Sequence, residues 1–229
     1  MTSPEQKIPG QKIHAPLSGP VQHPSNGQAP AKLIMLLHGL GADGQDLIPL
    51  AHSLAADFPD TLFFAPDAPY PCDMAPFGRQ WFSLRDWSHA AMRAGVEQAA
   101  PVVLSTVAHV QQQYGLKNEQ TALLGFSQGA MVALRAGLES EPPLAGIASF
   151  SGALVHDIKN VSEAQTPVCF IHGDSDPLVP VAETRAAFEQ LKKRQCRTEI
   201  HIRPGLEHGI DPAGLDKAAT FLHTAFKQP

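Results

Sequence analysis

Cysteine is scarce in this chain, with three residues among 229. Cys72, Cys169 and Cys196 are odd in number and show no C-x-x-C spacing. Such a set argues against a disulfide framework and against a structural zinc site. We therefore expect free thiols in a reducing compartment.

Long apolar runs and an excess of positive charge are also missing. The longest clear apolar run, residues 33–37, is far shorter than the roughly 18 residues that a membrane-spanning helix needs. The N-terminus has neither the basic start nor the apolar core of a secretory signal. The formal net charge of −5 disfavours nucleic acid as a partner, because phosphate binding needs a basic face. These absences predict a cytoplasmic protein without an integral membrane segment.

The composition predicts one globular domain that follows a flexible N-terminal extension. Hydrophobic residues make up 43% of the chain and charged residues 17%, which is typical of a packed protein. Residues 1–31, however, hold six prolines and three glycines. Proline removes backbone donors and glycine raises the entropy cost of ordering, so we expect a flexible extension there. Residues 32–229 would form a single domain.

From residue 32 onward, short apolar runs alternate with helical patterns, which predicts an α/β fold whose mostly parallel sheet has helices on both faces. Asp46 is expected to cap the first helix, and Pro180 and Asp211 to open two later ones. A helix over 93–114 should kink or divide at Pro101. Strands are expected over 33–37, 61–65, 121–125, 147–150, 168–172 and 198–202.

The clearest chemical signal is Gly125-Phe126-Ser127-Gln128-Gly129. It follows a predicted strand and precedes a predicted helix, which is the context of a nucleophile elbow, where a strained turn exposes the serine hydroxyl above the sheet. Bare G-x-S-x-G matches are common, and a coincidental glycine-rich turn is the alternative. The flanking elements favour Ser127 as a nucleophile.

Such a serine needs a base and an acid, which in this fold follow it in the order acid, then histidine. His208 lies on a late loop directly before the last predicted helix, and its position selects it among eleven histidines. His38 and His172 also end strands, but they precede the residues that they would have to follow. For the acid, Asp174 and Asp176 both follow the strand at 168–172, and one of them could simply bind loop amides.

An oxyanion hole needs preorganised donors. In this fold one donor is the backbone N–H after the nucleophile, here Gln128. The other comes from a loop after an earlier strand, and Leu40 in His38-Gly39-Leu40-Gly41 fits. A phosphate cradle is the alternative for that loop, but no lysine and no G-x-G-x-x-G pattern accompany it.

With these motifs in order, the chain closely resembles the phospholipase/carboxylesterase family of α/β-hydrolases, which includes acyl-protein thioesterases and lysophospholipases. The matching segments are L-H-G-L-G-A-D-G at 37–44, A-P-D-A-P at 65–69, G-F-S-Q-G-A at 125–130, G-D-S-D-P-L-V-P at 173–180 and P-G-L-E-H at 204–208. The chain departs from the family where W-[FY]-D is common and Trp81-Phe82-Ser83 stands here.

The resemblance implies the α/β-hydrolase fold and a triad of Ser127, Asp176 and His208, because the family's acid is the second aspartate of G-D-x-D. It also implies Leu40 and Gln128 amides as the oxyanion hole, no metal or cofactor, and often a homodimer. The expected substrates are short- to medium-chain acyl esters or thioesters, small molecules, lipids or acyl-proteins. A lysophospholipase and a catalytically silent binding protein are the alternatives.

The long connection from Pro66 to Ala91 is a candidate substrate cover. Its apolar side chains would line an acyl groove or merely pin the loop to the body. The candidate substrate-binding residues are Met74, Phe77, Trp81 and Phe82 from this loop, with Val179 from the loop that carries the acid.

Overall fold

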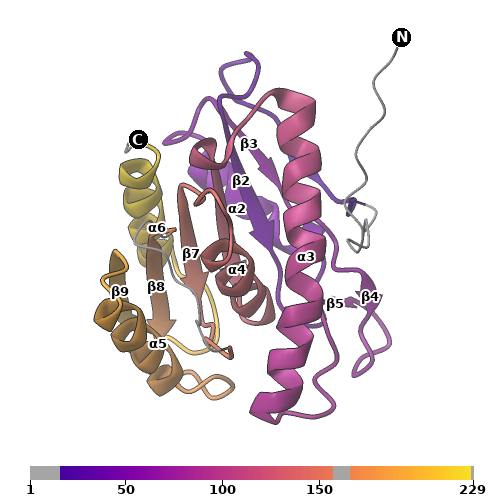
Figure 1. Cartoon of the computed structure of the whole chain (residues 1–229), viewed down its shortest axis with the longest axis vertical. Helices are drawn as coiled ribbons and strands as arrows, with labels where there is room; N and C mark the ends of the chain where they lie inside the picture. Colours follow the sequence, from indigo (N-terminus) through magenta and orange to yellow (C-terminus); the bar gives the residue numbers. More distant parts are fainter. Residues whose placement is uncertain (1–15, 157–165, 228–229) are drawn as a thin grey trace.

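A computed structural model describes residues 16–156 and 166–227. Its centre is a seven-stranded sheet in the order β1-β3-β2-β6-β7-β8-β9, parallel throughout except for β1 (Figure 1). The strands are β1 Val21–Gln22, β2 Lys32–Leu37, β3 Thr61–Phe64, β6 Thr121–Phe126, β7 Gly146–Phe150, β8 Val168–Gly173 and β9 Thr198–Arg203. A separate hairpin pairs β4 Tyr70–Pro71 with β5 Arg79–Gln80. The expected fold class is confirmed.

Helices cover both faces of the sheet, as the continuous apolar runs of the strands require. The helices are α1 Gly44–Leu47, α2 Pro49–Leu54, α3 His89–Tyr114, α4 Gln128–Leu138, α5 Val181–Lys193 and α6 Pro212–Ala225, with a 3-10 turn, η1, at Asn118–Gln120. Alternate residues of β2 point to opposite faces. Leu33 and Met35 pack with α3, α4 and α5, whereas Ile34 and Leu36 pack with α2 and α6. The molecule thus has two apolar cores, one on each side of the sheet.

Two helix details differ from the sequence-based expectation. The first helix is capped by Asp43 rather than Asp46; Asp43 accepts the Asp46 N–H, and Asp46 accepts the Asp43 N–H in return, which is a capping box. At Pro101, where a kink or a division was expected, the helix is not divided, and α3 continues through the proline. Pro101 and Glu97 are both exposed. The carbonyl that loses its helical partner therefore faces water, which lowers the cost of the proline.

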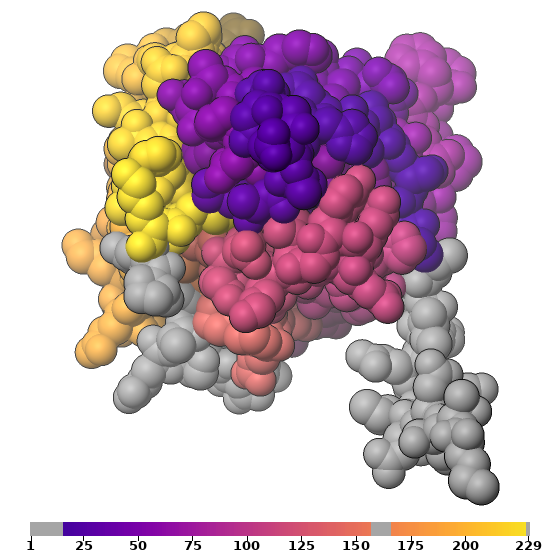
Figure 2. Space-filling model, turned by 90° about the horizontal axis from the view of Figure 1, so that it is seen from above, coloured from indigo at the N-terminus to yellow at the C-terminus, as the bar shows by residue number. Residues whose placement is uncertain are grey.

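The last part of the segment predicted to be a flexible extension, residues 16–31, bonds to the body of the molecule, and residues 1–15 lie outside the described residues. The Ala65 N–H donates to the Pro20 carbonyl and the Asp67 N–H to the Ser18 carbonyl, so the segment from residue 16 packs along β3. Figure 2 shows these indigo residues directly against the body of the molecule. Pro20 is tolerated there because it contributes its carbonyl to the bond with Ala65, which needs no N–H from the proline.

Parallel strands bring their carboxyl ends to one edge of the sheet, where ligands bind in open α/β folds. The loops after β2, β6, β8 and β9 therefore converge, and the arrowheads of β2, β7 and β8 point to that edge in Figure 1. No helix within the described ranges is both long and apolar enough to cross a membrane.

Two buried histidines lie at this edge and are held neutral. His38 is 0% exposed; its Nδ1 contacts the Gly39 carbonyl at 2.8 Å, and its Nε2 accepts the Ala68 N–H at 3.0 Å. His172 is 1% exposed, with Nε2 at 2.9 Å from the Val179 carbonyl. Burial is the largest influence on both and lowers the pKa of each imidazole below its ordinary value.

This burial predicts acid-sensitive stability. Because the pKa values of the two histidines are lowered in the folded state, the unfolded chain binds more protons than the folded protein below about pH 6.5. The free energy of unfolding should fall from pH 7.5 to 5.5, by at most about 1.4 kcal/mol per pH unit for each histidine. Urea unfolding at both values measures it. His172→Gln, which cannot titrate, should show a smaller decrease; equal stability of the natural chain at both values would contradict the prediction.

Candidate active site

Ser127 occupies a sharp turn between β6 and α4. Its φ of 53° and ψ of −118° are unusual for a residue with a side chain. The turn is closed tightly by its flanking glycines: a Cβ at Gly125 would lie 2.5 Å from the Gly129 carbonyl oxygen, and one at Gly129 would lie 2.1 Å from that of Leu37. The Ser127 N–H donates to the Phe150 carbonyl at 2.9 Å, which fixes the turn to β7. This is the geometry of a nucleophile elbow.

The loops after β8 and β9 bring Asp176 and His208 together. Asp176 Oδ2 lies 2.7 Å from His208 Nδ1, and its Oδ1 accepts the N–H groups of Leu178 and Val179 at 2.9 Å each. Desolvation by itself raises the pKa of Asp176, but the hydrogen bonds from Val179, His208 and Leu178 outweigh it and hold the pKa below its ordinary value. Asp176 is thus an anion that holds the imidazole in one orientation.

Asp174, the other candidate acid, does a different task. Its Oδ1 accepts the Gly205 N–H at 2.7 Å and the Ser175 hydroxyl at 3.0 Å. These bonds tie the loop after β8 to the loop after β9. The side chains of the two aspartates therefore point in different directions: Asp176 contacts the His208 imidazole, and Asp174 accepts the Gly205 N–H.

Sequence reasoning ranked His172 below His208 and did not foresee its place beside the acid. His172 Nε2 lies 3.1 Å from Asp176 Oδ2. Since this nitrogen faces two acceptors, the Asp176 carboxylate and the Val179 carbonyl, the neutral ring carries its proton there. Its Nδ1 lies 2.7 Å from the Thr184 hydroxyl on α5. Asp176 is consequently held by two histidines, and the signal in the sequence was only a polar residue ending a buried strand.

The loop after β2 lies beside the serine. A Cβ at Gly39 would be 3.4 Å from the Ser127 Cβ. The N–H groups of Gly41 and Ala42 bond to other backbone carbonyls, whereas among the described residues the Leu40 N–H has no acceptor. The Gln128 N–H, at the first position of α4, has no acceptor within its helix. On the other side, the centroids of the Phe126 and His208 rings are 4.8 Å apart. Ser127, His208 and the two N–H groups without acceptors therefore lie in the same region.

The aromatic residues of the long connection are anchors of that loop. Trp81 is 1% exposed, and its indole N–H donates to the His38 carbonyl at 2.8 Å. The Gln128 side chain accepts the Trp81 N–H at 2.9 Å and donates to the Phe82 carbonyl at 2.8 Å. Phe82 is buried against Gly95 of α3. This geometry favours the anchoring alternative that the sequence left open for Trp81 and Phe82.

The remaining candidate substrate residues are divided. Met74 and Phe77 are 52% and 74% exposed, near the turn of the β4–β5 hairpin. Val179 is buried and lines an apolar pocket between α3, α4 and the loops after β7 and β8. Its lining residues are Trp87, His89, Met92, Met131, Ala153, Val155, Leu178, Val179, Pro180 and Glu183. Met131 is one helical turn after Ser127, and Val179 donates to Asp176, so this pocket adjoins the serine and the acid.

The departure from the family pattern at Ser83 has a local replacement. The Ser83 hydroxyl donates to Asp73 Oδ2 at 2.7 Å, and it accepts the Arg85 N–H at 3.3 Å. Arg85 also pairs with Asp73, at 3.3 Å. A carboxylate is therefore present in this loop, but it comes from residue 73 instead of residue 83.

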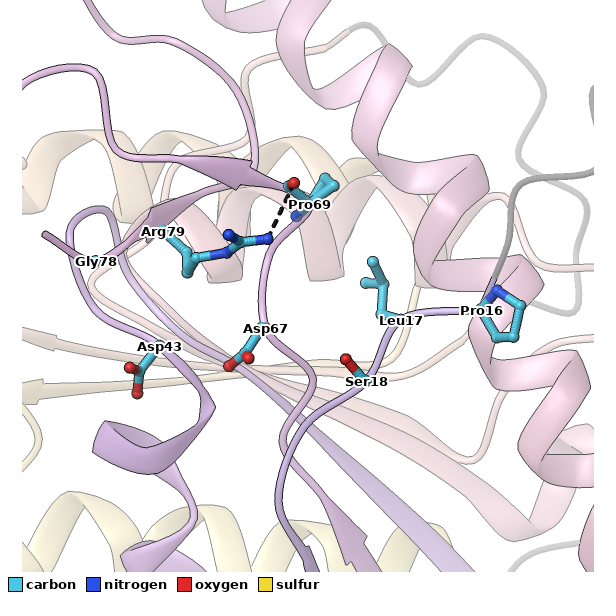
Figure 3. Close-up of a pocket in the computed structure, with 8 residues that line it drawn as sticks. All are labelled: Pro16, Leu17, Ser18, Asp43, Asp67, Pro69, Gly78 and Arg79. Atoms are coloured by element: carbon cyan, nitrogen blue, oxygen red, sulfur yellow. Dashed lines mark hydrogen bonds between the residues drawn. The ribbon is translucent and has the colours of Figure 1, made fainter.

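A larger polar cavity of about 460 Å³ lies on the other side of the β2 loop (Figure 3). Asp43, Asp67 and Arg79 face it, but the Arg79 guanidinium donates to the carbonyls of Ala68 and Pro69, and Asp67 accepts the Gly44 N–H. Asp67 and Arg79 therefore form hydrogen bonds that fix the neighbouring backbone. The cavity is lined by none of Ser127, Asp176 and His208.

Comparison with known proteins identifies the family of this chain. The model of the Phospholipase/Carboxylesterase family matches residues 21–226. Esterase YpfH of Escherichia coli is 32% identical over 192 residues, which cover 83% of this chain and 82% of that protein. Acyl-protein thioesterase 1 of Saccharomyces cerevisiae is 30% identical over 85% of this chain and 93% of its own length.

A solved structure is more similar still. The crystal structure of esterase PE8 is 42% identical, covers 92% of this chain and 100% of its own, and superposes with a TM-score of 0.85. The family match spans nearly the whole of the described chain, and the similarity of fold to esterase PE8 agrees with it. The chain belongs to the phospholipase/carboxylesterase family and is a hydrolase of the carboxylesterase and thioesterase type.

Proposed function

We propose that this protein hydrolyses carboxylic esters or thioesters through an acyl-enzyme on Ser127, with His208 as the base and Asp176 as the acid. The observation that carries the proposal is the 2.7 Å contact between Asp176 Oδ2 and His208 Nδ1, beside a serine in elbow geometry. With Nδ1 bound to the carboxylate, the proton-accepting atom of the imidazole is Nε2, which is the arrangement that a serine nucleophile needs.

The chemistry then follows two symmetric halves. The Ser127 oxygen bonds to the acyl carbon while its proton passes to His208 Nε2, and the carbonyl electrons move to oxygen. When this intermediate collapses, the alcohol or thiol leaves with the proton from His208. Water then attacks the acyl-enzyme, again losing a proton to His208, and the carboxylic acid is released as Ser127 recovers its hydrogen. Asp176 stabilises the imidazolium in both halves without taking a proton.

The developing oxyanion needs donors that are already in place. The N–H groups of Leu40 and Gln128 are the proposed pair; their support is that neither has an acceptor among the described residues, whereas the N–H groups of Gly41 and Ser127 beside them do. Gln128 would have a second duty, because its side chain holds Trp81 and Phe82. An amide fixed in this way costs no reorganisation when charge appears.

The acyl group would lie in the apolar pocket around Met131, Val155 and Val179. The support is its position between the helix that follows Ser127 and the loop that holds Asp176. Trp87 and Leu178 are 52% and 62% exposed and flank this pocket. An acyl chain of short to medium length bound in this pocket would be removed from water, and each buried methylene contributes about 0.8 kcal/mol to binding.

Ser127→Ala should lower ester turnover by several orders of magnitude, on the scale of about 10⁶ for a triad serine. The variant should stay folded, because the turn depends on Gly125 and Gly129. Hydrolysis of a p-nitrophenyl ester and labelling by a fluorophosphonate measure the effect, with circular dichroism as the control for folding. A folded variant that is still labelled would rule out Ser127 as the nucleophile.

Asp176→Asn and Asp174→Asn form a matched pair. Asp176→Asn should reduce kcat on the order of 10⁴-fold, because the carboxylate that orients His208 is lost. Asp174→Asn should keep most of kcat and lower the free energy of unfolding by about 1 kcal/mol, since its bond to Gly205 is weakened. Steady-state kinetics and urea unfolding of both variants test the assignment, and an inactive Asp174→Asn variant beside an active Asp176→Asn variant would invert it.

Two tryptophans separate the acyl wall from the loop anchor. Trp87→Ala should lower kcat/KM more for an octanoyl than for an acetyl ester, because acetate does not reach the pocket wall. Trp81→Ala should reduce stability and affect both esters alike, because it removes the bond to the His38 carbonyl. The ratio of the two kcat/KM values in each variant is the measurement. An unchanged ratio in Trp87→Ala would exclude Trp87 from the acyl wall.

A further inference from the structure

Three side chains of different chemistry from β8 and β9 meet away from the proposed catalytic residues. Cys169 is directly opposite Glu199 in the parallel pairing of these strands, and His201 lies two residues further along β9. Residues two apart point to the same face of a sheet. On this face Cys169 packs in the core beneath α6, so the sheet presents a thiol, a carboxylate and an imidazole to one point.

The spacing of the donor atoms suits a small metal ion. The ligand atoms of the three residues all lie within 4.8 Å of one another, and His201 Nε2 is 3.5 Å from Glu199 Oε2. Zinc bound tetrahedrally at about 2.0–2.3 Å holds its ligand atoms roughly 3.3–3.7 Å apart. To bind zinc, the donor atoms that are farthest apart would have to move closer to one another by a distance on the order of 1 Å. The Glu199 and His201 side chains are 43% and 29% exposed, so they have room for this movement.

We propose that Cys169, Glu199 and His201 bind one divalent transition-metal ion of the zinc type, with a fourth position open to solvent. Thiolate, neutral imidazole and carboxylate are all preferred zinc ligands. Binding replaces the thiol proton of Cys169, which passes to solvent, and the thiolate and carboxylate together neutralise the two charges of the ion. Lys217 of α6 is the cation close enough to act on Cys169; it is exposed and can turn into solvent when the ion binds.

The location sets the expected consequence. Cys169 is seven residues before Asp176, and His201 is seven residues before His208, so the same two strands carry the metal ligands at one end and the proposed acid and base at the other. β9 is the last strand of the sheet and pairs on one side only. An ion held by both strands would join this edge strand to β8 and resist their separation. The expected effect is therefore stabilisation of the folded protein, since ligands that bind only the native state raise its stability.

Cobalt(II) titration of the full chain tests the site directly, because thiolate ligation of cobalt gives an intense charge-transfer absorption in the near ultraviolet. The natural chain should show this band, saturating at one equivalent, and Zn²⁺ should abolish it by displacement. Zn²⁺ should also raise Tm by a few degrees. Cys169→Ala should lose the band, and Glu199→Gln and His201→Gln should weaken cobalt binding at least tenfold.

Cys196→Ala is the matched control, because Cys196 is also a buried free cysteine but lies outside the cluster. This variant should keep the band and the Zn²⁺-dependent rise in Tm. If Cys169→Ala does not fold, the partly exposed Glu199→Gln and His201→Gln variants carry the test. The proposal is overturned if the natural chain shows no thiolate band at millimolar cobalt, if the band survives in Cys169→Ala, or if Cys196→Ala removes it.

Discussion

The site depends on the pairing of β8 with β9. The two strands run in parallel register from Val168 opposite Thr198 to Gly173 opposite Arg203, and the chain then leaves both at the same level. A Cβ at Gly173 would lie 2.0 Å from the Leu206 carbonyl oxygen, so the second loop passes immediately over the end of the first strand. Only this close approach lets a carboxylate from one loop meet an imidazole from the other. The Asp174 bond to Gly205 fixes the same two loops from outside.

The second constraint comes from the elbow itself. Its helix begins with Gln128, whose side chain makes two hydrogen bonds: the oxygen accepts the Trp81 N–H, and the nitrogen donates to the Phe82 carbonyl. The Gln128 N–H has no acceptor within the helix. Trp81 in turn donates to the carbonyl of His38, at the base of the loop beside Ser127. One glutamine therefore joins the start of α4, the long connection and the β2 loop. The cost of leaving any of these buried polar groups unpaired maintains the arrangement.

Much of the fold and part of the candidate site could be predicted from the sequence, for reasons that differ from one feature to the next. The buried strands are apolar runs bounded by turn residues, so six of them were predicted to within a residue of each end, and the order of Ser127, the acid and His208 followed from the fold. The two-residue strands β1, β4 and β5 were missed because so few residues carry no periodicity. The choice between Asp174 and Asp176 came from family resemblance alone, because side-chain direction in a loop is set by contacts that spacing does not encode. His172, the Gln128 contacts and the Cys169, Glu199 and His201 cluster all join residues far apart in the chain.

The two ends of the sheet have a consequence for how copies of this protein could meet. One end is closed by β1, which offers only two residues, Val21 and Gln22, and runs antiparallel to its neighbour. The other end is β9, where the ionisable side chains of Glu199, His201 and Arg203 alternate with Thr198, Ile200 and Ile202. Short strands and charged edges both discourage the addition of another strand. A continuous sheet across two molecules is therefore disfavoured, and any association between copies would have to use helix surfaces or loops.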